Sequence, residues 1–146
     1  MTNTAVPSVQ DAIVYAINGE ATIPYGPDAT GSYTIPLLGN PRVYRDKAPA
    51  TAVLGYFIIG SASEAEGGFL NGQNGHGGTQ RIHCWSTSTA NAIRLYQWLK
   101  RLLDQKLILS DHTVLSFGTR LMTTQSDPDG KAWQAIMDYT VDSLEI

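Results

Sequence analysis

The sequence predicts an α+β fold in which a single mixed or antiparallel sheet carries two helices packed on one face. Two segments have the apolar spacing of amphipathic helices, and the last third of the chain alternates apolar and polar residues as a β-hairpin does. An irregular N-terminal arm and a glycine-rich loop complete the predicted fold. No internal repeat or linker divides the chain, so we expect one domain over residues 1–146.

The composition indicates a globular chain that is neither disordered nor membrane-spanning. Of its 146 residues 42% are hydrophobic and 16% charged, and the net charge is −3. No Lys/Arg run is present, so direct sequence-specific binding of nucleic acid is not expected. Met1–Pro7 lacks the pattern of a signal peptide, and no apolar stretch is long enough for a membrane helix, so a soluble protein is predicted. Cys84 is the one cysteine, so no intramolecular disulfide framework is expected.

Ser8–Ile17 is predicted to form a short amphipathic helix. Its apolar residues recur at the spacing that makes one stripe, namely Val9, Ala12, Ile13, Ala16 and Ile17. Ser8 suits the N-cap, Asp11 suits the positive end of the helix, and Gly19 suits its C-terminal stop.

Prolines and glycines interrupt Glu20–Pro49 so often that no long regular element fits there. Short extended pieces are expected at Ser32–Leu38 and at Val43–Tyr44. The segment therefore predicts an irregular arm that either wraps a neighbour or loops over its own core.

The next predicted strand, Ala52–Ser61, is apolar on both faces, which indicates cover by a helix on one side and by another surface, such as a second subunit, on the other. Gly67–Gly78 contains six glycines in twelve residues and is predicted to be a mobile loop.

A strand at Thr79–Trp85 is expected to place Ile82 and Cys84 on one face and Arg81, His83 and Trp85 on the other. Ser86, Thr87 and Ser88 offer N-caps for the main helix, Thr89–Gln105. Its predicted core stripe consists of Ala92, Ile93, Tyr96, Leu99 and Leu103. Leu95, Trp98 and Leu102 widen this stripe beyond what one sheet face requires.

The chain ends in a predicted hairpin of Val114–Thr124 and Ala132–Leu144, joined by the turn Asp127–Gly130. The second strand has the most regular alternation in the sequence, with one face formed by Trp133, Ala135, Met137, Tyr139 and Val141.

No residue pattern supports catalysis, a metal or a cofactor. The three histidines, His76, His83 and His112, fall in a loop, on a strand and in a turn. Cys84 and His83 are adjacent on a strand and so face opposite sides, which excludes a thiol–base pair. Glu64 and Glu66 lie in a polar neighbourhood that would not shift a carboxyl pKa for acid–base work.

The segment Arg81–Leu103, a strand that ends near Trp85, a Ser/Thr-rich cap and a helix, resembles the tail completion or tail terminator proteins of long-tailed phages and gene transfer agents. The terminal hairpin, the opening helix and the element Arg42-Val43-Tyr44 before an apolar strand also match that family in order. The Glu20–Pro36 arm and the Gly67–Gly78 loop depart from it by their length.

The resemblance implies a structural virion protein without enzymatic activity. It implies a ring, six-membered in this family, that caps the tail tube and joins it to the head connector, with DNA passing through the lumen. The partners would be further copies of the chain, the tail tube protein and the connector, with no membrane. The virion protein would be made in the host cytoplasm. The residues expected at the subunit interface are Leu54, Tyr56, Ile58, Leu95, Trp98 and Leu102.

Two alternatives remain at this stage. A head–tail connector or stopper subunit would share the α+β class and the ring. A small-ligand or carbohydrate-binding module would use Trp85 and the glycine-rich segment instead, and would be a monomer or dimer in solution.

Overall fold

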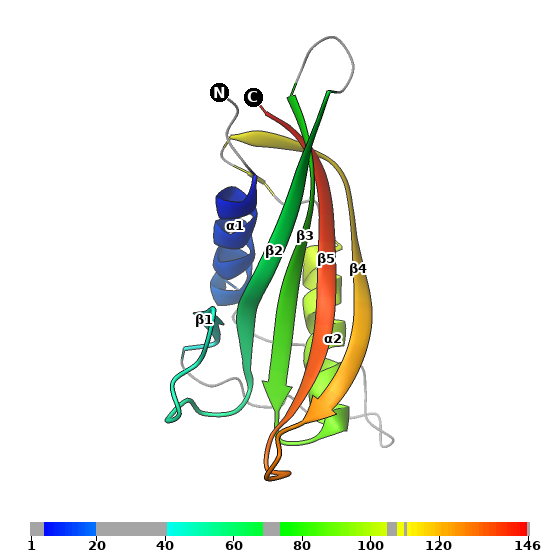
Figure 1. The fold of residues 1–146 in the computed structure, drawn as a ribbon. Helices are drawn as coiled ribbons and strands as arrows, with labels where there is room; N and C mark the ends of the chain where they lie inside the picture. Colours follow the sequence, from blue (N-terminus) through cyan, green and yellow to red (C-terminus); the bar gives the residue numbers. More distant parts are fainter. Residues whose placement is uncertain (1–4, 20–40, 69–73, 105–107, 110, 146) are drawn as a thin grey trace.

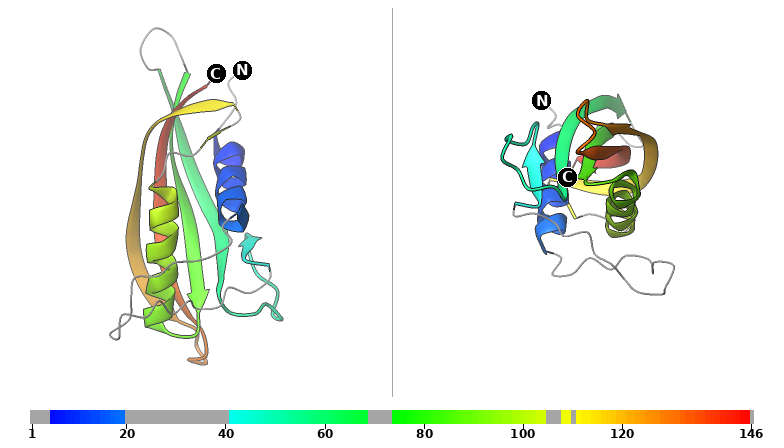
Figure 2. Two further views of the ribbon diagram at one scale, coloured as in Figure 1. Left: turned by 180° about the vertical axis from the view of Figure 1, so that it is seen from behind. Right: turned by 90° about the horizontal axis from the view of Figure 1, so that it is seen from below.

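A five-stranded sheet with two helices on one of its faces forms the described part of the chain, so the predicted α+β fold is confirmed (Figures 1 and 2). The computed structural model describes residues 5–19, 41–68, 74–104, 108–109 and 111–145. The elements in chain order are α1 (Val6–Gly19), β1 (Val43–Arg45), β2 (Tyr56–Gly68), β3 (Asn74–Ser86), α2 (Thr89–Leu103), β4 (His112–Ser126) and β5 (Trp133–Glu145).

The strand order is β1-β2-β3-β5-β4, with a parallel β1–β2 pair and antiparallel pairs elsewhere. The last strand of the sequence therefore lies inside the sheet, and the long strand β4 forms one edge. Both helices cover the same face, where the apolar residues of alternate sheet positions form the core. Neither of the described helices covers the other face, which is turned to the viewer in Figure 1.

Helix α1 is longer than predicted and begins at Val6. Val9, Ile13 and Ile17 are buried, as the apolar stripe predicts, and the helix ends at Gly19. Ser8 lies within the first turn and is not the cap; its hydroxyl donates instead to the carboxylate of Asp111.

Strand β2 begins at Tyr56 and not at Ala52, because Gly55 has a φ of 98° and turns the chain there. The strand then continues to Gly68, and β3 begins at Asn74.

The prediction of a mobile loop over Gly67–Gly78 is wrong for its described ends. Gly67 pairs with Gly75 between β2 and β3, and Gly78 pairs with Val141 of β5. Residues 69–73 and the predicted extended piece Ser32–Leu38 lie outside the described residues. Val43–Tyr44, the other predicted piece, is the core of β1.

Helix α2 begins as predicted, with Ser88 as its N-cap: the backbone N–H of Asn91 donates to Ser88 Oγ over 3.1 Å. The buried residues of the helix are Ala92, Leu95, Trp98, Leu99 and Leu103. Ile93 and Tyr96 are only half-buried. The core stripe is thus centred nearer to Leu95 than predicted. It includes Trp98, whose ring stacks on the core residue Phe57 with 5.6 Å between ring centroids.

The terminal hairpin is confirmed: β4 is longer than predicted, and β5 is displaced by one residue from the predicted Ala132–Leu144. The N–H of Gly130 donates to the carbonyl of Asp127 over 2.9 Å, and Gly130 has a φ of 71°. Ala135, Met137, Tyr139 and Val141 are buried on the helix side. Trp133, at the start of β5, is only half-buried, because the strand begins there at the end of the sheet.

Candidate functional site on the open face

The open face of the sheet is lined by apolar and aromatic side chains at the end where β3 stops. Directly opposed residues of neighbouring strands share a face. Tyr56 is opposite Trp85, and Ile58 is opposite His83, which is in turn opposite Ile136 of β5. These residues alternate with core residues such as Phe57 and Cys84 along the same strands.

A groove of about 470 Å³ crosses this end of the open face. Tyr56, Ile58 and Trp85 contribute aromatic and apolar side chains to it, and Leu54 lies beside them. Its other residues come from the connection before β2 and from the β4–β5 turn: Lys47, Ala48, Pro49, Ala50, Ala52, Asp127, Asp129, Lys131 and Ala132. An apolar surface with charged residues at its margin is typical of a protein contact site.

Tyr56 of this groove is in contact with an aromatic residue of the neighbouring strand. Its ring packs edge-on against Tyr44 of β1, with 5.4 Å between centroids. Partial burial, followed by the proximity of Tyr44 and Asp127, raises the pKa of the Tyr56 hydroxyl. The hydroxyl therefore stays neutral at physiological pH and serves in hydrogen bonding or packing, not as an anion.

The expected interface residues fall into two groups. Leu54, Tyr56 and Ile58 lie together in the groove and are half-buried within the subunit. Leu95 and Trp98 are 0% and 3% exposed in the core, where a second copy cannot reach them. Leu102 packs partly buried at the margin of that core. Leu95 and Trp98 therefore pack inside the subunit and do not add to the apolar surface that this side of the helix offers to a partner.

Charged residues occupy the middle of the open face. The guanidinium of Arg81 binds the Asp138 carboxylate with two N–O distances of 2.9 and 3.2 Å. Arg120 of β4 is opposite the same aspartate on the next strand. The Asp138 hydrogen bond and charge raise the pKa of Arg81, so the guanidinium stays protonated. This arrangement fixes β3 to β5 and leaves the Arg120 side chain exposed.

One cluster of polar residues could be mistaken for a catalytic site. Ser8 Oγ donates to Asp111, and His112 Nδ1 lies 2.6 Å from the same carboxylate oxygen. The hydrogen bond from Ser8 is the main cause that lowers the pKa of Asp111. The His112 side chain is fully buried, so no substrate can reach the imidazole. Asp111 instead ties α1 to the start of β4. This link has no local signal in the sequence, because Ser8 and Asp111 are 103 residues apart.

The remaining candidates for chemistry are also structural. His83 Nδ1 lies 2.7 Å from Gln134 Oε1 on the open face, whereas Cys84 is fully buried on the other face, as predicted. Burial raises the pKa of the Cys84 thiol, so this group is not an activated nucleophile. Within the described ranges, no three His, Cys, Asp or Glu side chains meet in a metal-binding group. None of the described helices is long and apolar enough to cross a membrane.

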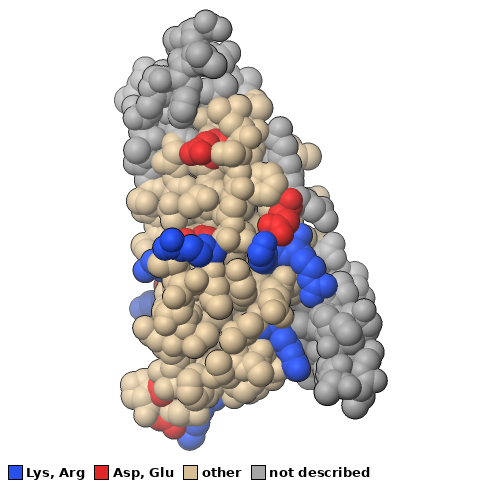
Figure 3. All heavy atoms as spheres, turned by 90° about the vertical axis from the view of Figure 1, so that its right-hand side faces the viewer, with Lys and Arg blue, Asp and Glu red and all other residues tan. Residues whose placement is uncertain are grey.

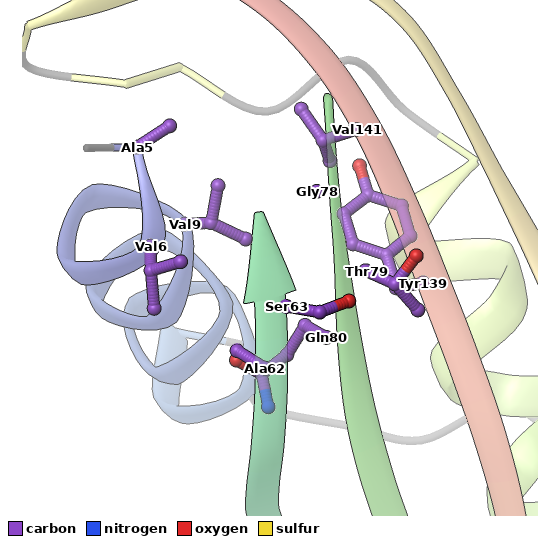
Figure 4. Close-up of a pocket in the computed structure, with 10 residues that line it drawn as sticks. All are labelled: Ala5, Val6, Val9, Ala62, Ser63, Gly78, Thr79, Gln80, Tyr139 and Val141. Atoms are coloured by element: carbon purple, nitrogen blue, oxygen red, sulfur yellow. The ribbon is translucent and has the colours of Figure 1, made fainter. Parts of the chain in front are cut away.

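A small cavity lies between the start of α1 and the sheet (Figure 4). Val9 lines it from the helix, and Gln80 and Tyr139 line it from β3 and β5. With about 20 Å³ it has room for one water molecule and not for a substrate. Burial raises the pKa of Tyr139 as well. This cavity is therefore a packing feature of the core.

The comparisons with known proteins agree with a structural and not a catalytic role. No curated protein matches the sequence. Among solved structures, a chain from the virion of a native gene transfer agent particle has the same fold, with a TM-score of 0.71. The similarity covers 98% of this chain and 99% of that one at 13% sequence identity.

The family model described as tail completion protein gp17 matches residues 35–141. This range contains all five strands up to Val141, helix α2 and the groove of the open face. This one family thus matches more than half of the chain, and the resemblance carried by Arg81–Leu103 is confirmed. The chain belongs to the tail completion protein gp17 family and is a structural protein of a phage-like tail, not an enzyme.

Proposed function

We propose that six copies of the chain form a ring that caps the tail tube and joins it to the head connector. The observation that carries this proposal is the family match over residues 35–141. The full-length similarity to a chain of a gene transfer agent virion supports it, because the fold is kept without any large insertion on either side. The ring would be part of the virion, with subunits made in the host cytoplasm.

The groove of the open face supplies a contact surface for such an assembly. It presents Leu54, Tyr56 and Ile58 beside Trp85, and neither α1 nor α2, the helices of the described residues, covers this face. Aromatic and aliphatic residues in a concave surface are the usual centre of a protein interface. We assign this surface to a contact with an adjacent subunit or with the tail tube.

Neighbouring positions on β2 provide a matched test of this assignment. Ile58 lies in the groove and Ile59 is 1% exposed in the core. We expect Ile58→Glu to give a folded subunit that fails to complete tails, because a desolvated carboxylate would oppose the partner. Ile59→Glu should prevent folding, since it buries an unpaired charge in the core.

The measurements are circular dichroism of each variant and a tail-completion assay in cells that lack the wild-type protein. A folded Ile58→Glu variant that completes tails at the wild-type level would remove the groove from the interface. Electron microscopy of tagged particles tests the location: label at the head-proximal end of the tail tube supports the cap. Label found only within the connector favours the stopper subunit. Particles without any label contradict both the tail cap and the stopper.

A further inference from the structure

Strand β4 forms the free edge of the sheet on the side opposite β1. Its fifteen residues include no proline, and Arg120 is the one Lys, Arg, Asp or Glu among them. Beyond Val114 none of its residues is buried. In Figure 3, which looks onto the β4 side, most of the described surface is neither acidic nor basic. Proteins normally protect a long edge strand with lysines, prolines or a covering element, so this edge indicates a contact with another chain.

The middle of β4 offers its backbone to a further strand. The pairing with β5 is irregular between Val114 and Ser116 and again between Leu121 and Thr123, whereas Ser116–Leu121 pairs without a shift. Every second residue of such a segment directs its N–H and C=O away from the sheet. Among the described residues, no backbone–backbone hydrogen bond joins this segment to an element other than β5. An extended chain can therefore pair along Ser116–Leu121.

The side chains of this edge differ between the two faces of the sheet. Phe117 is opposite Val141 and therefore lies on the helix face, where its side chain is still 36% exposed. Leu115, two residues earlier, is 52% exposed. Arg120 is opposite Asp138 and therefore lies on the open face. The edge thus presents apolar side chains on one face and a basic side chain on the other.

Within the part of the chain that the structure describes, Arg120 has no carboxylate partner. The carboxylate of Asp138 is bound by Arg81, with 2.9 Å between Arg81 Nε and Asp138 Oδ1. Asp142 lies further along β5, about 13 Å from Asp138 in an extended strand, and accepts a hydrogen bond from Ser116 Oγ. Because a guanidinium forms its strongest contacts with carboxylates, the open face of this edge suits an acidic residue of a partner.

We propose that the β4 edge binds an extended segment of another virion protein, which pairs with Ser116–Leu121 as an added strand. The segment has an apolar residue opposite Phe117 and an aspartate or glutamate opposite Arg120. These two residues are three positions apart in the added strand, so their side chains lie on opposite faces, as those of Phe117 and Arg120 do.

The bound segment belongs to a different protein and not to a second copy of this chain. All five described strands are already part of one sheet, so none of them is a free extended segment. In a closed ring, equivalent surfaces of neighbouring copies do not meet, which excludes a pair of two β4 strands. The inference rests on the ring proposed above for this last step alone.

Amide hydrogen exchange, measured by mass spectrometry on the free subunit and on purified particles, tests the added strand. We expect the outward amides of Ser116–Leu121 to exchange about tenfold more slowly in particles, because each then donates to the partner. Unchanged exchange overturns the inference. Slow exchange already in the free subunit, together with a dimer in native mass spectrometry, also overturns it, since two copies would then pair through β4.

Charge variants test the acidic residue of the partner. Arg120→Glu should reduce the amount of subunit in purified particles by about tenfold, whereas Arg120→Lys should keep most of it. Arg101→Glu on α2 is the matched control, because Arg101 is also exposed and has no carboxylate partner among the described residues. Wild-type incorporation of Arg120→Glu, or an equal loss in Arg101→Glu, overturns the assigned contact. Thermal midpoints of the free variants verify that each is folded.

A photoreactive benzoylphenylalanine in place of Leu115 identifies the bound chain. Cross-links in irradiated particles to a different virion protein support the inference, and cross-links only between copies of this chain overturn it. Electron microscopy of the same particles judges the ring separately. A six-fold ring in particles whose β4 amides exchange as in the free subunit overturns the added strand and leaves the ring intact.

Discussion

Gly60 of β2 allows a close approach between two strands. A Cβ atom at this position would lie 2.9 Å from Nε2 and 3.1 Å from Cδ2 of His83. The imidazole is held in place by Gln134, with 2.7 Å between Nδ1 and Oε1. We expect Gly60→Ala to lower the free energy of unfolding by about 1–3 kcal/mol, since the ring or the strand must move. Denaturant unfolding measures this change.

Gly19 provides the control for Gly60. It ends α1, and no atom lies within 4 Å of a Cβ built there. Gly19→Ala should therefore leave stability unchanged or raise it by up to about 1 kcal/mol. Combining Gly60→Ala with His83→Ala should recover part of the loss. If Gly60→Ala alone is as stable as the wild type, the contact with His83 is not restrictive.

Asp111 makes stability depend on acid. The hydrogen bond from Ser8 and the contact with His112 lower its pKa and outweigh the partial desolvation of the carboxylate. The unfolded chain therefore binds a proton at the Asp111 carboxylate more tightly than the folded chain does. The stabilisation is thus complete above the unfolded value, about pH 4, and disappears as the pH falls below it. Asp111→Asn should lower the melting temperature at pH 6 and change it much less at pH 3. An equal change at both values would exclude this carboxylate as the cause.

At the scale of elements, the N-cap of α2 is a local feature with a measurable effect. Ser88 Oγ accepts from the N–H of Asn91, and Ser88→Ala leaves that donor without its side-chain partner. We expect a loss of about 1 kcal/mol in the free energy of unfolding. Ser88→Asp keeps the acceptor and should retain most of the stability. Urea unfolding of the two variants makes the comparison; equal losses would show that the hydroxyl is not the relevant group.

The elements that could be predicted are those with a signal inside the segment itself. Helix α2 follows from its cap and apolar stripe, and the β4–β5 hairpin follows from its alternation and its turn. The extended ends of β2 and β3 could not be predicted, because glycine-rich sequence favours neither strand nor helix. What orders Gly75 and Gly78 is pairing with Leu144 and Val141, which lie far along the chain.

The residues of the candidate site could likewise be predicted only where their own segment carries a signal. Ile58 and Tyr56 are predicted interface residues because the sequence of their strand is apolar on both faces, and both side chains line the groove. The opposite wall, from Asp127 to Ala132, depends on the strand order and gives no local signal. The sequence predicts that Leu95 and Trp98 widen the apolar stripe of the helix. Their exposure of 0% and 3%, together with the stacking of Trp98 on Phe57, shows that both belong to the core.

At the scale of the whole molecule, Cys84 reports on global unfolding. Its side chain is 0% exposed in the middle of the sheet, and burial raises its pKa, so a thiol reagent should not reach a reactive thiolate in the folded state. We expect native protein to react with Ellman's reagent no faster than it unfolds, as measured by circular dichroism. The denatured chain, as control, should react at once. Rapid labelling of native protein would show local opening of β3.

The position of β5 inside the sheet has a consequence for synthesis. Strands β3 and β4 are joined only through β5, which is the last of them to leave the ribosome. Until Trp133–Glu145 has been translated, the nascent chain has helix α2 but no completed sheet for it to cover, and β4 has no neighbour. Release before this strand would leave a product without the centre of its fold, which cellular proteases would remove. The topology thereby couples incorporation into a particle to the translation of β5.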